Sequence, residues 1–246
     1  MKHSIYKDRK IRIPIFGGYS TGKSSLLNSL IGFGDILPTG SGICTKRGII
    51  IRNNPEGNYI LYNSKFIRKG DYYYFEEGNI EIKTEKKEVY KLKEKIIELN
   101  NVNISKVEDS FLILSVPLEC FKNMKLSSDI INKIELIDFP GIDNGNDFFE
   151  KDIMNPLLKL SDTFIFVNPC NLIGTESNIN NIQNIISKIE NRKVKFDYNS
   201  CLFVLNQCDK EPNLNVNECQ KQIIKILFQD RNKSNIIFDF FQNINF

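Results

Sequence analysis

Residues 17–24, GGYSTGKS, constrain the fold of this chain more than any other stretch, because they fit the pattern G-x-x-x-x-G-K-S/T at every fixed position. Residues 11–16, before this segment, alternate and are rich in β-branched side chains, which predicts a strand. Residues 25–31, after it, carry apolar side chains at helical spacing. In a strand–loop–helix unit, the loop N–H groups and the positive end of the helix point at an anion. The segment therefore predicts a cradle for the phosphates of a nucleoside triphosphate.

Two side chains of the segment have individual roles in such a cradle. Lys23 would reach the β- and γ-phosphates, and the Ser24 hydroxyl would bind Mg²⁺. The nucleotide-contacting residues predicted here are Gly17, Gly18, Tyr19, Ser20, Thr21, Gly22, Lys23, Ser24 and Ser25.

Composition limits the remaining possibilities. The 246 residues are 41% hydrophobic and 26% charged, which suits one substantial α/β core. A formal charge of +3 is too mild to indicate nucleic acid, so we expect no nucleic-acid partner. The six cysteines include no C-x-x-C pair and there is one histidine, which favours neither a zinc site nor a disulfide framework. With no long apolar run, we expect a soluble, cytoplasmic protein.

Two later positions fit the chemistry of a bound triphosphate. Residues 133–137 read as a strand that ends at Asp138 in the sequence DFPG, where a carboxylate can hold Mg²⁺ through water. In the same turn, the Gly141 N–H can bond the γ-phosphate. Thr45 follows Lys23 by 22 residues in a loop with proline and glycines, where a threonine can complete the Mg²⁺ shell. The predicted metal ligands are thus Ser24, Thr45 and Asp138.

A fourth motif concerns the base. Residues 200–205 read as a buried strand that ends in Asn206-Gln207-Cys208-Asp209, which resembles the guanine-reading pattern Asn/Thr-Lys-x-Asp. The Asp209 carboxylate would accept hydrogen bonds from guanine N1–H and from the exocyclic amine, and adenine offers neither in that geometry. Asn206, Gln207 and Asp209 therefore predict binding of GTP and GDP.

Residues 37–47, LPTGSGICTKR, resemble the switch I signature of the dynamin superfamily of large GTPases, and Ser20 in the phosphate loop agrees with it. The resemblance implies that Ser20, Gly40 and Gly42 hold a charge-compensating monovalent cation, K⁺ or Na⁺, and the attacking water. It covers about residues 9–240 and implies one G domain over 1–246.

At four positions the chain departs from the family pattern. Tyr19 stands where the family usually has Gln, Thr39 where Arg is common, and Gln207 where the family has a Lys whose stem packs on the base. Relatives place an acidic residue in the loop over 168–177 to brace the partner G domain, and the aligned residue here is Ile173, with Glu176 nearby.

The function implied by the resemblance is GTP binding and hydrolysis, with Ser20, Lys23, Thr45 and Gly141 as the catalytic group. It also implies membrane remodelling by fission, fusion or tubulation, pairing of two G domains as a homodimer, and peripheral membrane contact through a helical bundle and stalk that this sequence does not contain. Two alternatives remain. One is a nucleotide-binding adaptor without turnover, and the other is an RNA-linked regulatory GTPase.

The expected fold is α/β: a P-loop NTPase G domain with a mostly parallel central sheet, helices on both faces and an insert at about 52–134. In that insert, tyrosine-rich strands over 59–62 and 72–75 suit a core or sheet edge better than a base-stacking platform. Thr84 is the expected N-cap of a helix with a solvated charged face, and Asn217 with Gln220 the expected capping box of a later helix. Further strands are predicted over 48–51, 111–116, 163–167 and 235–240, and helices over 84–99, 148–160, 179–189 and 217–228.

Overall fold

The computed structural model describes residues 10–32, 34–39, 47–69, 72–102, 109, 111–121, 126–140, 157–158, 161, 163–190, 201–208 and 215–227. Within them, eight strands form one sheet in the order β4-β3-β5-β2-β6-β1-β7-β8. The strands are β1 (Ile11–Phe16), β2 (Gly48–Asn53), β3 (Tyr59–Lys69), β4 (Tyr72–Thr84), β5 (Phe111–Val116), β6 (Ile134–Asp138), β7 (Phe164–Pro169) and β8 (Cys201–Asn206). The helices are α1 (Lys23–Ile31), α2 (Val89–Asn101), α3 (Ser128–Ile131), α5 (Glu176–Glu190) and α6 (Val216–Leu227).

The sheet is mostly parallel, as predicted. Strand β1 lies between β6 and β7 and is parallel to both, and the pairs β7–β8 and β2–β5 are also parallel. The antiparallel pairs are β2–β6, β3–β5 and the β3–β4 hairpin. Because β2 runs against β6 with Ile49 opposite Asp138, the start of β2 lies at the edge where β6 ends. We call this the phosphate edge, since β1 also ends there and leads into residues 17–24.

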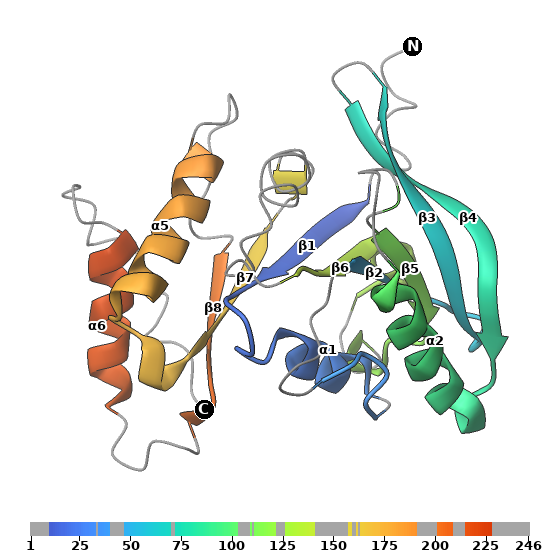
Figure 1. Ribbon diagram of the computed structural model, residues 1–246, viewed down its shortest axis with the longest axis horizontal. Helices are drawn as coiled ribbons and strands as arrows, with labels where there is room; N and C mark the ends of the chain where they lie inside the picture. The colour runs from blue at the N-terminus through green and yellow to red at the C-terminus, as the bar shows by residue number, and fades with distance from the viewer. Residues whose placement is uncertain are drawn as a thin grey trace.

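Each face of the sheet has its own apolar core. Leu27 and Ile31 of α1 and Leu92 and Ile96 of α2 pack on one face, where the two helices lie together in Figure 1. The opposite face is rich in phenylalanine, and the helical, buried Leu157 packs there. Neighbouring residues of a strand point to opposite faces, so the two cores alternate along β1. Helical residues therefore cover both faces, and α5 and α6 lie side by side at the β8 end (Figure 1).

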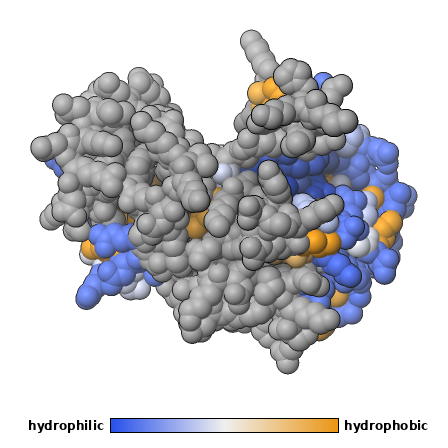
Figure 2. All heavy atoms as spheres, turned by 90° about the horizontal axis from the view of Figure 1, so that it is seen from above, coloured by the Kyte–Doolittle hydropathy of each residue, from blue (hydrophilic) through white to orange (hydrophobic). Residues whose placement is uncertain are grey.

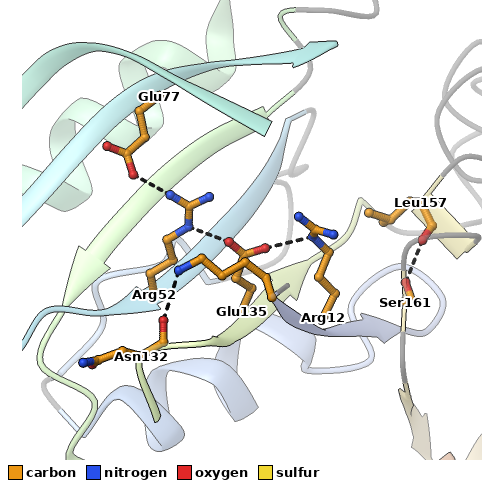
Figure 3. A network of polar contacts seen from close by, with 8 residues as sticks. Arg12, Arg52, Glu77, Asn132, Glu135, Leu157 and Ser161 are labelled. Atoms are coloured by element: carbon orange, nitrogen blue, oxygen red, sulfur yellow. Dashed lines mark hydrogen bonds and ion pairs between the residues drawn. The ribbon is translucent and has the colours of Figure 1, made fainter. Parts of the chain in front are cut away.

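A row of charges crosses the phenylalanine-rich face near the opposite edge. Glu135 is fully buried and lies between Arg12 and Arg52, its register partners on β1 and β2 (Figure 3). Its two carboxylate oxygens accept hydrogen bonds from the Nε atoms of the two arginines at 2.9 and 2.7 Å. Arg52 also pairs with the half-exposed Glu77 of β4, which ties the hairpin to the central sheet.

The insert contains the predicted element types: β5 has the predicted bounds, whereas the first two strands are longer and the helix begins later than predicted. The tyrosine-rich stretches belong to strands of 11 and 13 residues that form a hairpin at one end of the sheet, with Tyr59 buried. The apolar stripe of α2 packs inward, and its lysines and glutamates pair on the solvated side, as predicted. In the view of Figure 2, hydrophilic residues predominate among those described, with single hydrophobic residues between them.

Two helix starts differ from prediction. Thr84 caps no helix, since it ends β4 and its Oγ1 is buried without a partner among the described residues. A short 3-10 turn, Lys86–Glu88, then precedes α2. Helix α6 is capped by Asn215, whose Oδ1 accepts the Glu218 N–H at 3.2 Å, rather than by Asn217.

The structure also corrects the predicted burial of one strand and the predicted length of one loop. Strand β8, expected to be buried, is half-exposed because it pairs with β7 alone within the described residues, and Leu202 is 41% exposed. The predicted loop over 168–177 is shorter, since β7 extends to Pro169 and α5 begins at Glu176. The strand predicted over 235–240 and most of the helix predicted over 148–160 lie outside the described residues.

Candidate functional site

The loop that follows β1 turns sharply back over the sheet. Gly17 has no room for a side chain, because a Cβ there would lie 2.5 Å from the Val167 carbonyl oxygen. Gly22 has φ 93°, in the left-handed region, and the Asn206 amide occupies the place where its Cβ would be. Glycine is therefore required at both ends of the loop. The loop leads directly into α1, whose N-terminal end lies at the phosphate edge.

Lys23 lies buried under this loop. Its Nζ donates hydrogen bonds to the carbonyl oxygens of Gly17 at 3.1 Å and Gly18 at 2.7 Å. The Thr21 hydroxyl also donates to the Gly18 carbonyl, at 3.1 Å. These bonds close the loop around the ammonium group, which supplies a positive charge where a triphosphate would be held.

Asp138 and Ser24 meet at the end of β6. The Ser24 hydroxyl donates to Asp138 Oδ2 at 2.8 Å, while Oδ1 is buried and has no partner among the described residues. Burial raises the pKa of Asp138 to about 6, against the opposing effects of Lys23 and of the Ser24 hydrogen bond. A buried carboxylate with an unsatisfied oxygen beside a hydroxyl fits a hard cation.

The oxygen set suits Mg²⁺ more than a metal held by protein alone. No group of three or more His, Cys, Asp and Glu side chains gathers in the part of the chain that the structure describes. Mg²⁺ is commonly held by one or two protein oxygens together with substrate phosphates and water. Ser24 and Asp138 could hold it in that way.

The turn after β8 contacts the phosphate loop directly. Asn206 Nδ2 donates to the Thr21 carbonyl oxygen at 2.9 Å, and Gln207 Nε2 donates to the Ser20 carbonyl oxygen at 3.0 Å. The Cys170 thiol, after β7, donates to the Gln207 carbonyl oxygen at 3.2 Å. Residues some 185 positions apart in the chain thus form one site at the phosphate edge.

A cavity of about 160 Å³ lies beside the loop, between it, the end of β7 and the start of α5. The Asn178 amide donates to Asn168 Oδ1 at 3.0 Å across its wall. Tyr19, at the position of the family's Gln, lines this cavity and is 37% exposed. The brace position, Ile173, lies in the turn before α5, whose first residue is the exposed Glu176.

Several predicted site residues lie outside the described part of the chain: Gly40, Gly42, Thr45, Gly141 and Asp209. Their roles stay predictions. The structure does bring the others, residues 17–25, Asp138, Asn206 and Gln207, to one edge of the sheet.

Cys170 and Asn168 were not singled out from sequence as site residues. An isolated cysteine or asparagine belongs to no local pattern, so only the fold shows that the Cys170 thiol supports the turn containing Gln207. Their position at and directly after the end of a buried strand is the one signal that the sequence offers.

Comparison with known proteins agrees with this geometry. The family model described as "Dynamin family" matches residues 13–208. A bacterial protein from a solved structure, described as an oligomerised bacterial dynamin pair for long-range sensing and tethering of membranes, aligns with a TM-score of 0.54 at 22% identity. A second structure of that description aligns with a TM-score of 0.50 at 20% identity. Both alignments cover 97% of this chain and 35% of the other, so this chain spans about a third of the length of those proteins.

Proposed function

Because the chain belongs to the dynamin family, we propose that it is a G domain that binds GTP with Mg²⁺ and hydrolyses it. The observation that supports this most directly is the meeting of three separate segments at the phosphate edge. Lys23 at the start of α1, Asp138 at the end of β6 and Asn206 at the end of β8 are linked through Ser24 and Thr21. Such a meeting is what recognition of phosphate, metal and base together requires.

The proposed chemistry is positioning and electrostatic stabilisation. The loop N–H groups and Lys23 would neutralise the β- and γ-phosphate oxygens, and Ser24, Thr45 and Asp138 would hold Mg²⁺. The bound cation would neutralise charge that develops on the phosphate oxygens. Ser20, with Gly40, Gly42 and a K⁺ or Na⁺ ion, would position the attacking water, Gly141 would contact the γ-phosphate, and Asp209 would read guanine.

The first test is GTP hydrolysis at saturating GTP with Mg²⁺ and K⁺. We expect phosphate release above background by the parent protein, and none by Lys23→Ala, which removes the charge under the loop. Lys133→Ala, which changes a partly exposed lysine just before β6 at the opposite edge of the sheet, serves as the matched control and should keep parent activity. Binding of ATP as tight as that of GTP would contradict the proposal that Asp209 recognises guanine.

We further propose that the protein acts at membranes, in fission, fusion, tubulation or tethering, as part of an assembly that includes paired G domains. The descriptions of the two solved relatives, together with family membership, support this. Among the described residues, no helix has the length and apolar character needed to cross a bilayer. Co-sedimentation with liposomes, with and without a GTP analogue, tests membrane contact, and light scattering tests pairing.

A nucleotide-binding adaptor without turnover is the second candidate. It is favoured by Tyr19 and Gln207, which replace two family side chains at the site itself. GTP binding with phosphate release at background, and no change in liposomes, would decide for the adaptor.

A further inference from the structure

Two non-glycine residues in the described chain have positive φ, and one hydrogen bond joins them. Ser20 has φ 56° and Gln207 has φ 59°, and Gln207 Nε2 donates to the Ser20 carbonyl oxygen at 3.0 Å. Left-handed backbone at residues with a side chain persists only where the surroundings impose it, and it is concentrated at functional sites. The hydrogen bond between these two residues therefore joins two turns that both have left-handed backbone.

The backbone of Gln207 is held from its other side as well. The buried Cys170 thiol donates to the Gln207 carbonyl oxygen, and the neighbouring Asn206 amide donates to the Thr21 carbonyl oxygen. The amide side chains of two consecutive residues thus donate hydrogen bonds to the carbonyl oxygens of two consecutive residues of the phosphate loop. Their donors approach the loop from the side of β8.

These contacts determine where the loop N–H groups point. In a trans peptide the C=O of one residue and the N–H of the next are antiparallel. A Ser20 carbonyl directed at Gln207 therefore directs the Thr21 N–H away from it, and a Thr21 carbonyl directed at Asn206 does the same for the Gly22 N–H. No cis peptide bond occurs in the described chain. N–H groups at these positions of such a loop cradle the α- and β-phosphates.

We propose that Gln207 is a positioning residue for the phosphates: it acts through the Ser20 carbonyl to orient the Thr21 N–H toward the diphosphate. The inference rests on the proposed nucleotide binding. It differs from packing of the side-chain stem on the base, since it requires the amide donor and not the stem. It also links the turn that would read guanine to the residue that would hold the cation and water.

The decisive variant is Gln207→Met, which keeps a stem of similar length and removes the donor without adding charge. Loss of one hydrogen bond predicts a GDP affinity about five- to tenfold weaker. GMP lacks the β-phosphate, so its affinity should fall less, and the ratio of GDP to GMP affinity should fall with it. IDP lacks the exocyclic amine, and the ratio of GDP to IDP affinity should stay at the parent value. Gln207→Lys restores a donor and should regain most of the GDP affinity.

Gln222→Met, the same change on α6, is the matched control and should bind all three nucleotides as the parent does. Competition for a fluorescent GDP analogue measures all of these affinities, and circular dichroism establishes that each variant is folded. Gln207→Ala provides a second donor-free variant should Gln207→Met fail to fold.

Three results would overturn the proposal. These are parent-like GDP affinity in Gln207→Met, equal losses for GDP and GMP, and a fall in the GDP-to-IDP ratio that marks a base-packing role. A parent protein that binds no nucleotide would instead refute the proposed function. A parent that binds GDP but does not hydrolyse GTP refutes only the turnover, because every readout for Gln207 is an affinity.

Discussion

At the scale of single residues, the burial of the Asp138 carboxylate lowers the stability of the folded protein and leaves one of its oxygens available to a cation. It is 1% exposed, accepts one hydrogen bond from Ser24 and has a second oxygen without a partner among the described residues. Its raised pKa means that the ionised form is less favourable in the folded protein than in water. A cation at this carboxylate would remove that penalty.

This penalty gives a dependence of stability on pH. The folded pKa of about 6 lies above the unfolded value of 3.8, so the folded state binds the proton more tightly. The stability of the nucleotide-free protein should therefore fall as pH rises through this window, by about 1 kcal/mol from this group between pH 5 and pH 7.5. Urea unfolding at both pH values measures it. In Asp138→Asn, the free energy of unfolding should no longer show this part of the dependence on pH. The same dependence in parent and variant would contradict its attribution to Asp138.

At the scale of elements, the row formed by Arg12, Glu135 and Arg52 joins three strands of the sheet. Glu135 is fully buried, whereas the side chain of Glu77, the other partner of Arg52, is 50% exposed. A buried carboxylate that satisfies two arginines is costly to remove, while an exposed pair contributes little. Register between β1, β6 and β2 should therefore depend on Glu135.

Two alanine variants separate these contributions. Glu135→Ala should lower the free energy of unfolding by about 3 kcal/mol, since it leaves two arginines without their shared partner. Glu77→Ala should lower it by less than about 1 kcal/mol, because its pair with Arg52 is screened by water. Urea titration of both variants measures the two free energies of unfolding. Equal losses in the two variants would show that the burial of Glu135 does not determine its contribution to stability.

Elements with strong periodicity were predictable, and details set by distant contacts were not. Strand β1, helix α1 and strand β6 follow from local pattern and from the phosphate-loop motif. The hairpin was predicted too short because Glu76 and its polar neighbours hide a strand whose hydrogen bonds come from β3. Asn215 and Asn217 are alike in sequence, and only the backbone path decides which one caps α6.

The same distinction applies to the site. Residues of the phosphate loop and Asp138 were predictable because their chemistry fixes their spacing. That Gln207 reaches Ser20 and that Cys170 supports Gln207 could not be predicted, since each contact joins segments far apart in the chain.

At the scale of the whole molecule, ligand binding should report on global stability. The candidate site draws on the loop after β1, the end of β6 and the turn after β8, so a nucleotide bound as proposed would contact segments from both ends of the described chain. A ligand that binds only the folded state stabilises it by mass action.

We expect GDP with Mg²⁺ at about 100 times its dissociation constant to raise the melting temperature by about 5–10 °C. ADP at the same concentration should raise it far less. Lys23→Ala should show no shift with either nucleotide. Differential scanning fluorimetry measures all three, and equal shifts with GDP and ADP would contradict guanine recognition.

The reversal of β2 against β6 has a practical consequence for watching this protein at work. Because β2 begins at the phosphate edge, the exposed turn at residues 55–57 lies beyond the other end of the strand, at the opposite edge of the sheet from residues 17–24. A short reporter peptide inserted in that turn would meet solvent rather than ligand. Single molecules could be tethered there without blocking the phosphate edge.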